Sequence, residues 1–75
     1  MSTFLEYMEE KQIIDTYLNE GFKIKYIDEH IEGDTVTWEK RSTDIEDNRT
    51  LLIKTADARK YLGDVLINQL ILGLE

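Results

Sequence analysis

The sequence contains no cysteine and no proline, and it has a single histidine among its 75 residues. Without cysteine, the chain can form neither a disulfide framework nor a thiolate zinc site. Secreted domains of this size usually depend on such cross-links, so we expect a cytoplasmic protein. The first residues agree with this expectation, because Glu6, Glu9 and Glu10 stand where a signal peptide would carry positive charge and an apolar run.

Long apolar runs and an excess of positive charge are also missing. The most apolar stretch, residues 65–74, is interrupted by Asn68 and Gln69 and is too short to span a bilayer. The net charge is −7, from 16 acidic and nine basic residues. Lysine and arginine are needed to displace counterions from nucleic acid and to bind anionic lipid. We therefore expect no direct nucleic-acid partner and no membrane.

What the sequence does contain is enough apolar surface for one small core. Hydrophobic residues make up 41% of the chain and fall in periodic runs, which indicates a folded protein. A chain of this length forms at most one domain, and its core is thin. We expect residues 1–75 to form a single acidic α+β domain.

Residues 3–20 are predicted to form a helix. Thr3 and Glu6 have the spacing of a capping box, in which the two side chains satisfy free amides of the first turn. Gly21 suits the left-handed position after a helix, and Phe22 is then placed to pack back on Tyr17. Lys11 and Asp15 interrupt the apolar stripe of this helix. The stripe consists of Phe4, Tyr7, Met8, Ile14 and Leu18.

Two strands joined by a tight turn are predicted next. Residues 22–26 alternate between apolar side chains and lysine, and residues 35–38 are β-branched or aromatic. Gly33-Asp34 suits a two-residue type II′ turn, which would pair Ile31 with Val36 and Glu29 with Trp38. The predicted core side of this hairpin is Ile27, Ile31, Val36 and Trp38.

This register sends the apolar residues of 22–26 to the face opposite Ile27 and Ile31, because side chains alternate along a strand. A β-bulge near Ile27 or Asp28 would bring both sets to one face, and we favour this solution. A sheet with apolar cover on both faces is the alternative.

The rest of the chain predicts a third strand and a second helix. Residues 42–48 are polar and predict a loop, with Ile45 turned inward. Residues 50–54 predict a strand, although so short an apolar run also fits a buried helical segment. Thr55 suits the N-cap of a helix over 56–72, and Gly73 suits its end. The predicted order is α-β-β-β-α, an antiparallel three-stranded meander packed against two helices.

No catalytic or metal-binding pattern stands out. His30 lies on a predicted strand opposite Thr37, without an evident orienting partner, and is predicted to be a surface residue. Asp44 begins a cluster that resembles a calcium loop, but Arg49 and Thr55 occupy the positions where an EF-hand has glycine and glutamate. We therefore expect no enzyme, no cofactor and no metal.

Negative charge is concentrated in the first two thirds of the chain. Spaced carboxylates can stand in for phosphates in a basic groove. We hypothesise a non-enzymatic protein-binding module, an acidic inhibitor or modulator of a basic, nucleic-acid-handling host protein. The alternative is that the acidity serves only solubility. The predicted partner-binding residues are Glu6, Glu9, Glu10, Asp15, Asp28, Glu29, Glu32 and Asp34.

The small size and the acidity of the chain are similar to those of the accessory proteins with which phages and mobile elements block host machinery. This similarity, which no motif accompanies, implies an inhibitor of phage or mobile-element type.

The predicted second helix is apolar on two faces. Leu62, Val65, Leu66 and Leu70 form one face, and Ile67, Ile71 and Leu74 form another. One face can cover the sheet, and the second then needs the first helix, a second protomer or a partner protein. The alternative function is thus a small homodimeric structural or regulatory subunit with an interface at Ile67, Ile71 and Leu74. Gly63 in mid-helix indicates a close backbone approach at that point.

Overall fold

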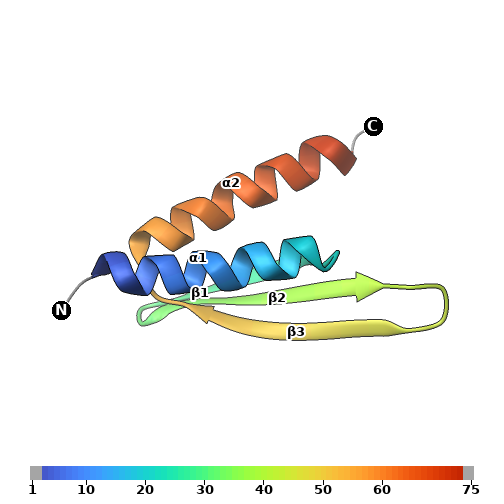
Figure 1. Ribbon diagram of the computed structural model, residues 1–75, viewed down its shortest axis with the longest axis horizontal. Coiled ribbons are helices and arrows are strands. Elements are labelled where there is room, and N and C mark those ends of the chain that lie inside the picture. Colours follow the sequence, from blue (N-terminus) through green and yellow to red (C-terminus); the bar gives the residue numbers. More distant parts are fainter. Residues whose placement is uncertain (1–2, 74–75) are drawn as a thin grey trace.

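The computed structural model describes residues 3–73, and it confirms the predicted order of elements (Figure 1). Helix α1 spans Thr3–Asn19 and helix α2 spans Ala56–Gly73. Between them lie three strands, β1 over Lys23–His30, β2 over Gly33–Arg41 and β3 over Glu46–Ile53. They form one antiparallel sheet in the order β1-β2-β3, so β1 and β3 are its two edges.

Helix α1 ends in the predicted glycine cap. Gly21 has a φ of 94°, its N–H donates to the carbonyl of Leu18, and the N–H of Phe22 donates to the carbonyl of Tyr17. This pair of bonds is a Schellman motif. The ring centroids of Tyr17 and Phe22 are 5.3 Å apart, so the predicted contact between them is confirmed. The predicted capping box at the other end depends on the side chain of Thr3, which lies outside the described part of the chain.

The β1–β2 hairpin turns two residues earlier than predicted. His30 pairs with Gly33, so the turn residues are Ile31 and Glu32. The predicted pairing of Ile31 with Val36 is wrong, because Ile27 pairs with Val36 and Ile31 is fully exposed. Gly33 follows the turn for a physical reason: its φ is 150°, and a Cβ built there would lie 2.7 Å from the carbonyl oxygen of Ile53.

A β-bulge does bring Ile24 and Ile27 to one face of the sheet, but it lies at Lys25. The register shifts between Ile24 and Tyr26, two residues before the predicted position. The bulge places Ile24 opposite Trp38 and Ile27 opposite Val36, both on the core face. Tyr26 falls on the opposite face and is half-exposed.

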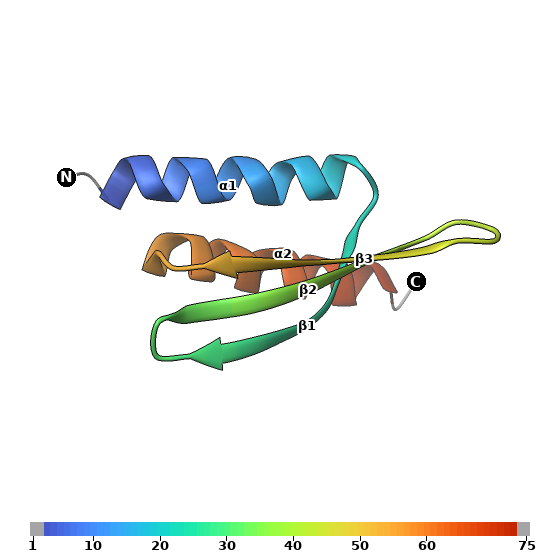
Figure 2. The ribbon, with the colours of Figure 1, turned by 90° about the horizontal axis from the view of Figure 1, so that it is seen from below.

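The core lies between one face of the sheet and the two helices, which both cover that face (Figures 1 and 2). Trp38 is completely buried at its centre, as predicted, and meets Tyr17 edge-on with 5.3 Å between ring centroids. Phe4 and Met8, which we predicted on the inner stripe of α1, are exposed because they lie on the flank of the helix, away from Ile14. The buried core consists of Ile14, Phe22, Ile24, Val36, Trp38, Ile53, Ala58 and Leu62.

The β2–β3 hairpin extends beyond both helices (Figure 1). Strand β3 begins at Glu46, so the connecting loop is shorter than the predicted 42–48. Ser42 closes it, with its backbone N–H donating to the carbonyl of Ile45 at 3.0 Å. The side chain of Ile45 is exposed, and the prediction that it turns inward is wrong. Beyond the helices there is no core for it to enter.

Helix α2 begins at the predicted N-cap. The hydroxyl of Thr55 accepts a hydrogen bond from the N–H of Ala58 at 3.2 Å. The close approach predicted at Gly63 is wrong, because no atom of the described residues lies within 4 Å of a Cβ built there, apart from the local backbone of its own helix. Gly63 therefore weakens the helix without a packing reason inside the domain.

Alanine substitutions at Gly63 and Gly33 should have opposite effects on stability. Gly63→Ala should raise the free energy of unfolding by about 1 kcal/mol, because alanine favours the helix and meets open space. Gly33→Ala should lower it by about 1–3 kcal/mol, through backbone strain and the clash with Ile53. Urea unfolding of both variants measures the difference. A destabilised Gly63→Ala would contradict the open environment.

Candidate protein-binding surfaces

Glu10, one of the predicted partner-binding residues, is engaged inside the domain. Its carboxylate accepts hydrogen bonds from the N–H of Lys54 at 2.6 Å and from the N–H and hydroxyl of Thr55 at 3.0 and 2.7 Å. These bonds join α1 to the segment between β3 and α2. A carboxylate with three internal donors is not available to a partner, so we remove Glu10 from the predicted set.

Asp15 is also engaged, in a contact between the two helices. It accepts a hydrogen bond from the hydroxyl of Tyr61 and pairs with Lys11, whose Nζ lies 2.9 Å from Oδ2. The bond from Tyr61, together with that from Lys11, holds the pKa of Asp15 below its ordinary value. The same bond raises the pKa of Tyr61. Asp15 therefore stabilises the helix pair, and we remove it from the predicted set as well.

The lowered pKa gives stability a defined pH dependence. A carboxyl whose pKa is lower in the folded protein contributes stability above its ordinary pKa, and this contribution is lost as the pH falls through the lowered value. Tyr61→Phe should raise the pKa of Asp15 toward its ordinary value and reduce the free energy of unfolding at pH 7 by about 1 kcal/mol.

NMR titration of the Asp15 carboxyl and urea unfolding at several pH values test this expectation. Tyr26→Phe is the matched control, because Tyr26 is half-exposed on the open face of the sheet and makes no side-chain hydrogen bond within residues 3–73. If Tyr61→Phe left the titration of Asp15 unchanged, the bond between the two helices would be disproved.

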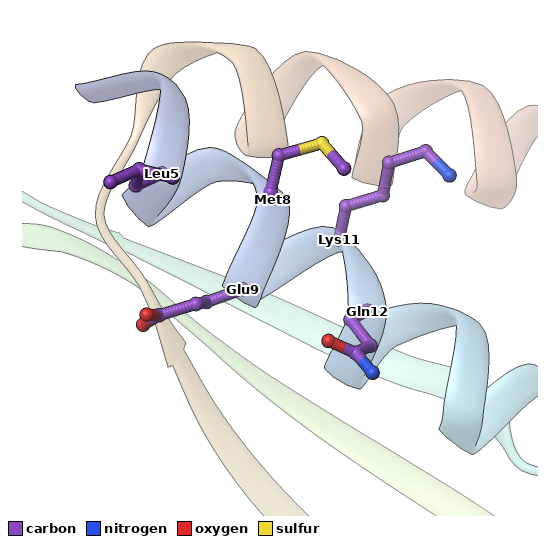
Figure 3. A pocket seen from close by; sticks show the side chains of 5 residues that line it. All are labelled: Leu5, Met8, Glu9, Lys11 and Gln12. Atoms are coloured by element: carbon purple, nitrogen blue, oxygen red, sulfur yellow. The ribbon is translucent and has the colours of Figure 1, made fainter. Parts of the chain in front are cut away.

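Glu6 and Glu9, the other predicted residues of α1, are exposed. Glu9 lies at a shallow hollow on this helix, lined also by Leu5, Met8, Lys11 and Gln12 (Figure 3). In this hollow Glu9 points away from Lys11, which extends toward α2. The charged groups of Glu9 and Lys11 therefore point in different directions and do not form one polar site; Leu5 and Met8 supply the apolar part of the lining.

The hairpin end of β1 and β2 carries the remaining predicted acidic residues. Asp28, Glu29 and Glu32 are exposed, and none of them makes an ion pair within the described part of the chain. Asp34 differs, because it is partly buried beneath α2 with its Oδ1 3.8 Å from Nε of Arg59. The structure thus brings three of the four predicted residues to one exposed end of the sheet, and we name Asp28, Glu29 and Glu32 the acidic tip.

The outward face of α2 is apolar and exposed. Ile67 and Ile71, the two described residues of the predicted oligomer interface, are 56% and 55% exposed; Leu74 lies outside the described residues. Leu70, which we predicted on the inner face, is 60% exposed and extends this surface. Sequence periodicity misplaced it because α2 diverges from the sheet toward its C-terminal end (Figure 1), which leaves fewer positions covered.

Sequence reasoning also missed a contact between α2 and β1. The side-chain amide of Gln69 accepts a hydrogen bond from the N–H of Ile24 at 2.9 Å and donates one to its carbonyl at 2.8 Å. An amide can make both bonds because it carries a donor and an acceptor side by side, as a peptide group of a strand does. Only the interruption of the apolar run at Gln69 hinted at a polar role.

Within residues 3–73, no group of three or more histidine, aspartate and glutamate side chains is placed to hold a metal ion. His30 is exposed at the end of β1, opposite Gly33 rather than the predicted Thr37. Neither α1 nor α2, as far as residues 3–73 show, combines the length and the apolar composition of a membrane-spanning helix.

Comparisons of the chain with models of known protein families, with curated proteins and with solved structures found no match. The functional assignment therefore depends on the chain's own surfaces.

Proposed function

We propose that this chain is a non-enzymatic protein-binding module that binds a basic surface on another protein, as an inhibitor or modulator of a nucleic-acid-handling protein. The observation that carries the proposal is the acidic tip. Its three carboxylates stand at one end of the domain, exposed and without ion-pair partners within the described residues. Glu10 and Asp15 differ, because their carboxylates are held by the segment before α2 and by Tyr61 of α2.

Charge of this kind acts mainly on association. At physiological salt, the attraction between opposite exposed charges is screened beyond roughly 8–10 Å. Several like charges at one end of a molecule therefore steer an oppositely charged partner toward that end. Each exposed pair contributes less than about 1 kcal/mol to affinity. The tip therefore sets the orientation and rate of approach, and close contacts elsewhere must supply the remaining affinity.

Neutralising the acidic tip should slow association with a basic partner. The triple variant Asp28→Asn, Glu29→Gln and Glu32→Gln should reduce the association rate about tenfold at low salt and flatten its salt dependence. The measurement is surface plasmon resonance against a partner recovered by affinity purification.

The matched control removes an equal number of negative charges, three, from the opposite end of the sheet, through Asp44→Asn, Glu46→Gln and Asp47→Asn. If both triple variants associated with the unchanged rate and salt dependence of the original chain, the acidity would serve only solubility. If both slowed association equally, net charge rather than the tip would be responsible.

The outward face of α2 supports a second candidate function, a homodimeric structural or regulatory subunit. Exposed apolar residues that gather on one surface mark interfaces more often than isolated ones do. Ile67, Leu70 and Ile71 are each more than half exposed and follow one another along the outer side of a single helix. A second copy of this chain could cover this face by isologous pairing of two α2 helices.

Ile67→Glu with Ile71→Glu should convert such a dimer to a folded monomer, because neither side chain belongs to the buried core. Light scattering gives the mass, and circular dichroism shows whether the fold is retained. The control is Ile45→Glu with Leu52→Glu, two exposed apolar residues away from α2, in the β2–β3 loop and on β3. A chain that is already monomeric at high concentration would rule out this candidate.

A further inference from the structure

The outer edge of β1 is open along part of its length. Among residues 3–73, strand β1 pairs only with β2, and no other strand or helix runs along its outer side (Figure 2). An edge strand presents unpaired N–H and C=O groups, which can receive a strand from another chain.

The register of the hairpin determines which backbone groups of β1 face away from β2. A two-residue turn is closed by a pair that exchanges backbone hydrogen bonds, here His30 with Gly33. Bonded and non-bonded pairs then alternate back along the strands, so Asp28 and Tyr26 bond to β2. The pairs at Glu29 and Ile27 are the non-bonded ones, and their N–H and C=O groups point away from the sheet.

The contact of Gln69 with Ile24 confirms this direction. Beyond the bulge at Lys25, Ile24 again turns its N–H and C=O outward, and both are bound by the amide of Gln69. The domain therefore covers the outward groups of β1 at Ile24 with a side chain that imitates a strand. Within the described residues, the outward groups of Ile27 and Glu29 have no such cover.

The side chains along the uncovered part of the edge select the charge of an incoming segment. Asp28 and Glu29 lie on this part, and Glu32 lies in the adjoining turn. Proteins commonly protect free edges with charge, and on this part of β1 the charge is negative, which repels an incoming acidic segment. A segment rich in lysine or arginine meets attraction instead.

We propose that a basic, extended segment of the partner protein adds to the edge of β1 as a fourth strand, bonding to the backbone of Ile27 and Glu29. The inference rests on the proposed function, because it names the part of a basic partner that the acidic tip would engage. The partner segment that fits this edge is short, because the uncovered residues 26–30 span about 17 Å at roughly 3.3 Å per residue. Specificity then comes from charge and backbone together.

A synthetic peptide of alternating arginine and threonine, with blocked ends, is the direct probe. On binding at low salt, the amide resonances of Ile27 and Glu29 should shift, and their hydrogen exchange should slow. The control peptide has the same sequence with alternate backbone amides N-methylated, so that it keeps the charge and loses the donors. It should bind about tenfold more weakly, since two or more backbone hydrogen bonds are lost.

A variant pair tests the same edge from the protein side. Glu29→Pro removes the outward N–H, and proline is tolerated where the N–H of an edge strand faces solvent. Glu29→Gln removes the same charge and keeps the N–H. The proline variant should bind the unmodified peptide about fivefold more weakly than the glutamine variant, with circular dichroism confirming that both are folded.

The outcomes separate this inference from the proposed function. If both peptides bind equally and the Ile27 and Glu29 amides keep their exchange rates, strand addition is overturned while salt-dependent binding at the acidic tip stands. Equal binding by the Glu29→Pro and Glu29→Gln variants leads to the same conclusion. If a confirmed partner binds without any salt dependence, the proposed function itself fails.

Discussion

The burial of Trp38 is the constraint on which the remaining structure depends. A three-stranded sheet can hide its largest aromatic side chain only if something covers that face, and both helices of the chain do so. Tyr17 and Ile14 of α1 and Leu62 of α2 complete the enclosure. Because both helices are used on one side, no helix or strand of residues 3–73 covers the opposite face, and the outer edge of β1 is covered only at Ile24, by Gln69. The surfaces left for a partner are thus a consequence of how a thin core is closed.

Polar contacts then decide which acidic residues remain for other purposes. Glu10 and Asp15 hold the two helices in place, through the backbone and hydroxyl donors of the β3–α2 segment and through Tyr61. Carboxylates at helix junctions are satisfied by fixed donors, whereas those at the acidic tip make no ion pair within the described residues. Charge distribution along the sequence therefore predicts only in part which carboxylates are available at the surface.

The fold was predictable from local signals, and the site only in part. The glycine cap at Gly21, the N-cap at Thr55 and the burial of Trp38 each follow from a few neighbouring residues. The prediction of the hairpin register was wrong because glycine is typical of a turn, and Gly33 was therefore placed in one. What requires glycine there is the close approach of Ile53, a residue far along the chain that local sequence does not reveal. The partners of Glu10 and Gln69 are 44 or 45 positions away. Composition gave the number of carboxylates, but their pairing depends on tertiary contacts.

Because the amide of Gln69 binds the backbone of Ile24, lifting of α2 from β1 can be distinguished from opening of the sheet. In most strands, slow exchange of an amide proton reports on the sheet itself, but the N–H of Ile24 is bound by a helix side chain on the outer edge. Its exchange rate is therefore governed by how often the C-terminal half of α2 lifts from the strand, while the amides paired with β2 follow opening of the whole sheet. Where α2 lifts from the strand more often than the sheet opens, this one proton in β1 reports the docking of α2.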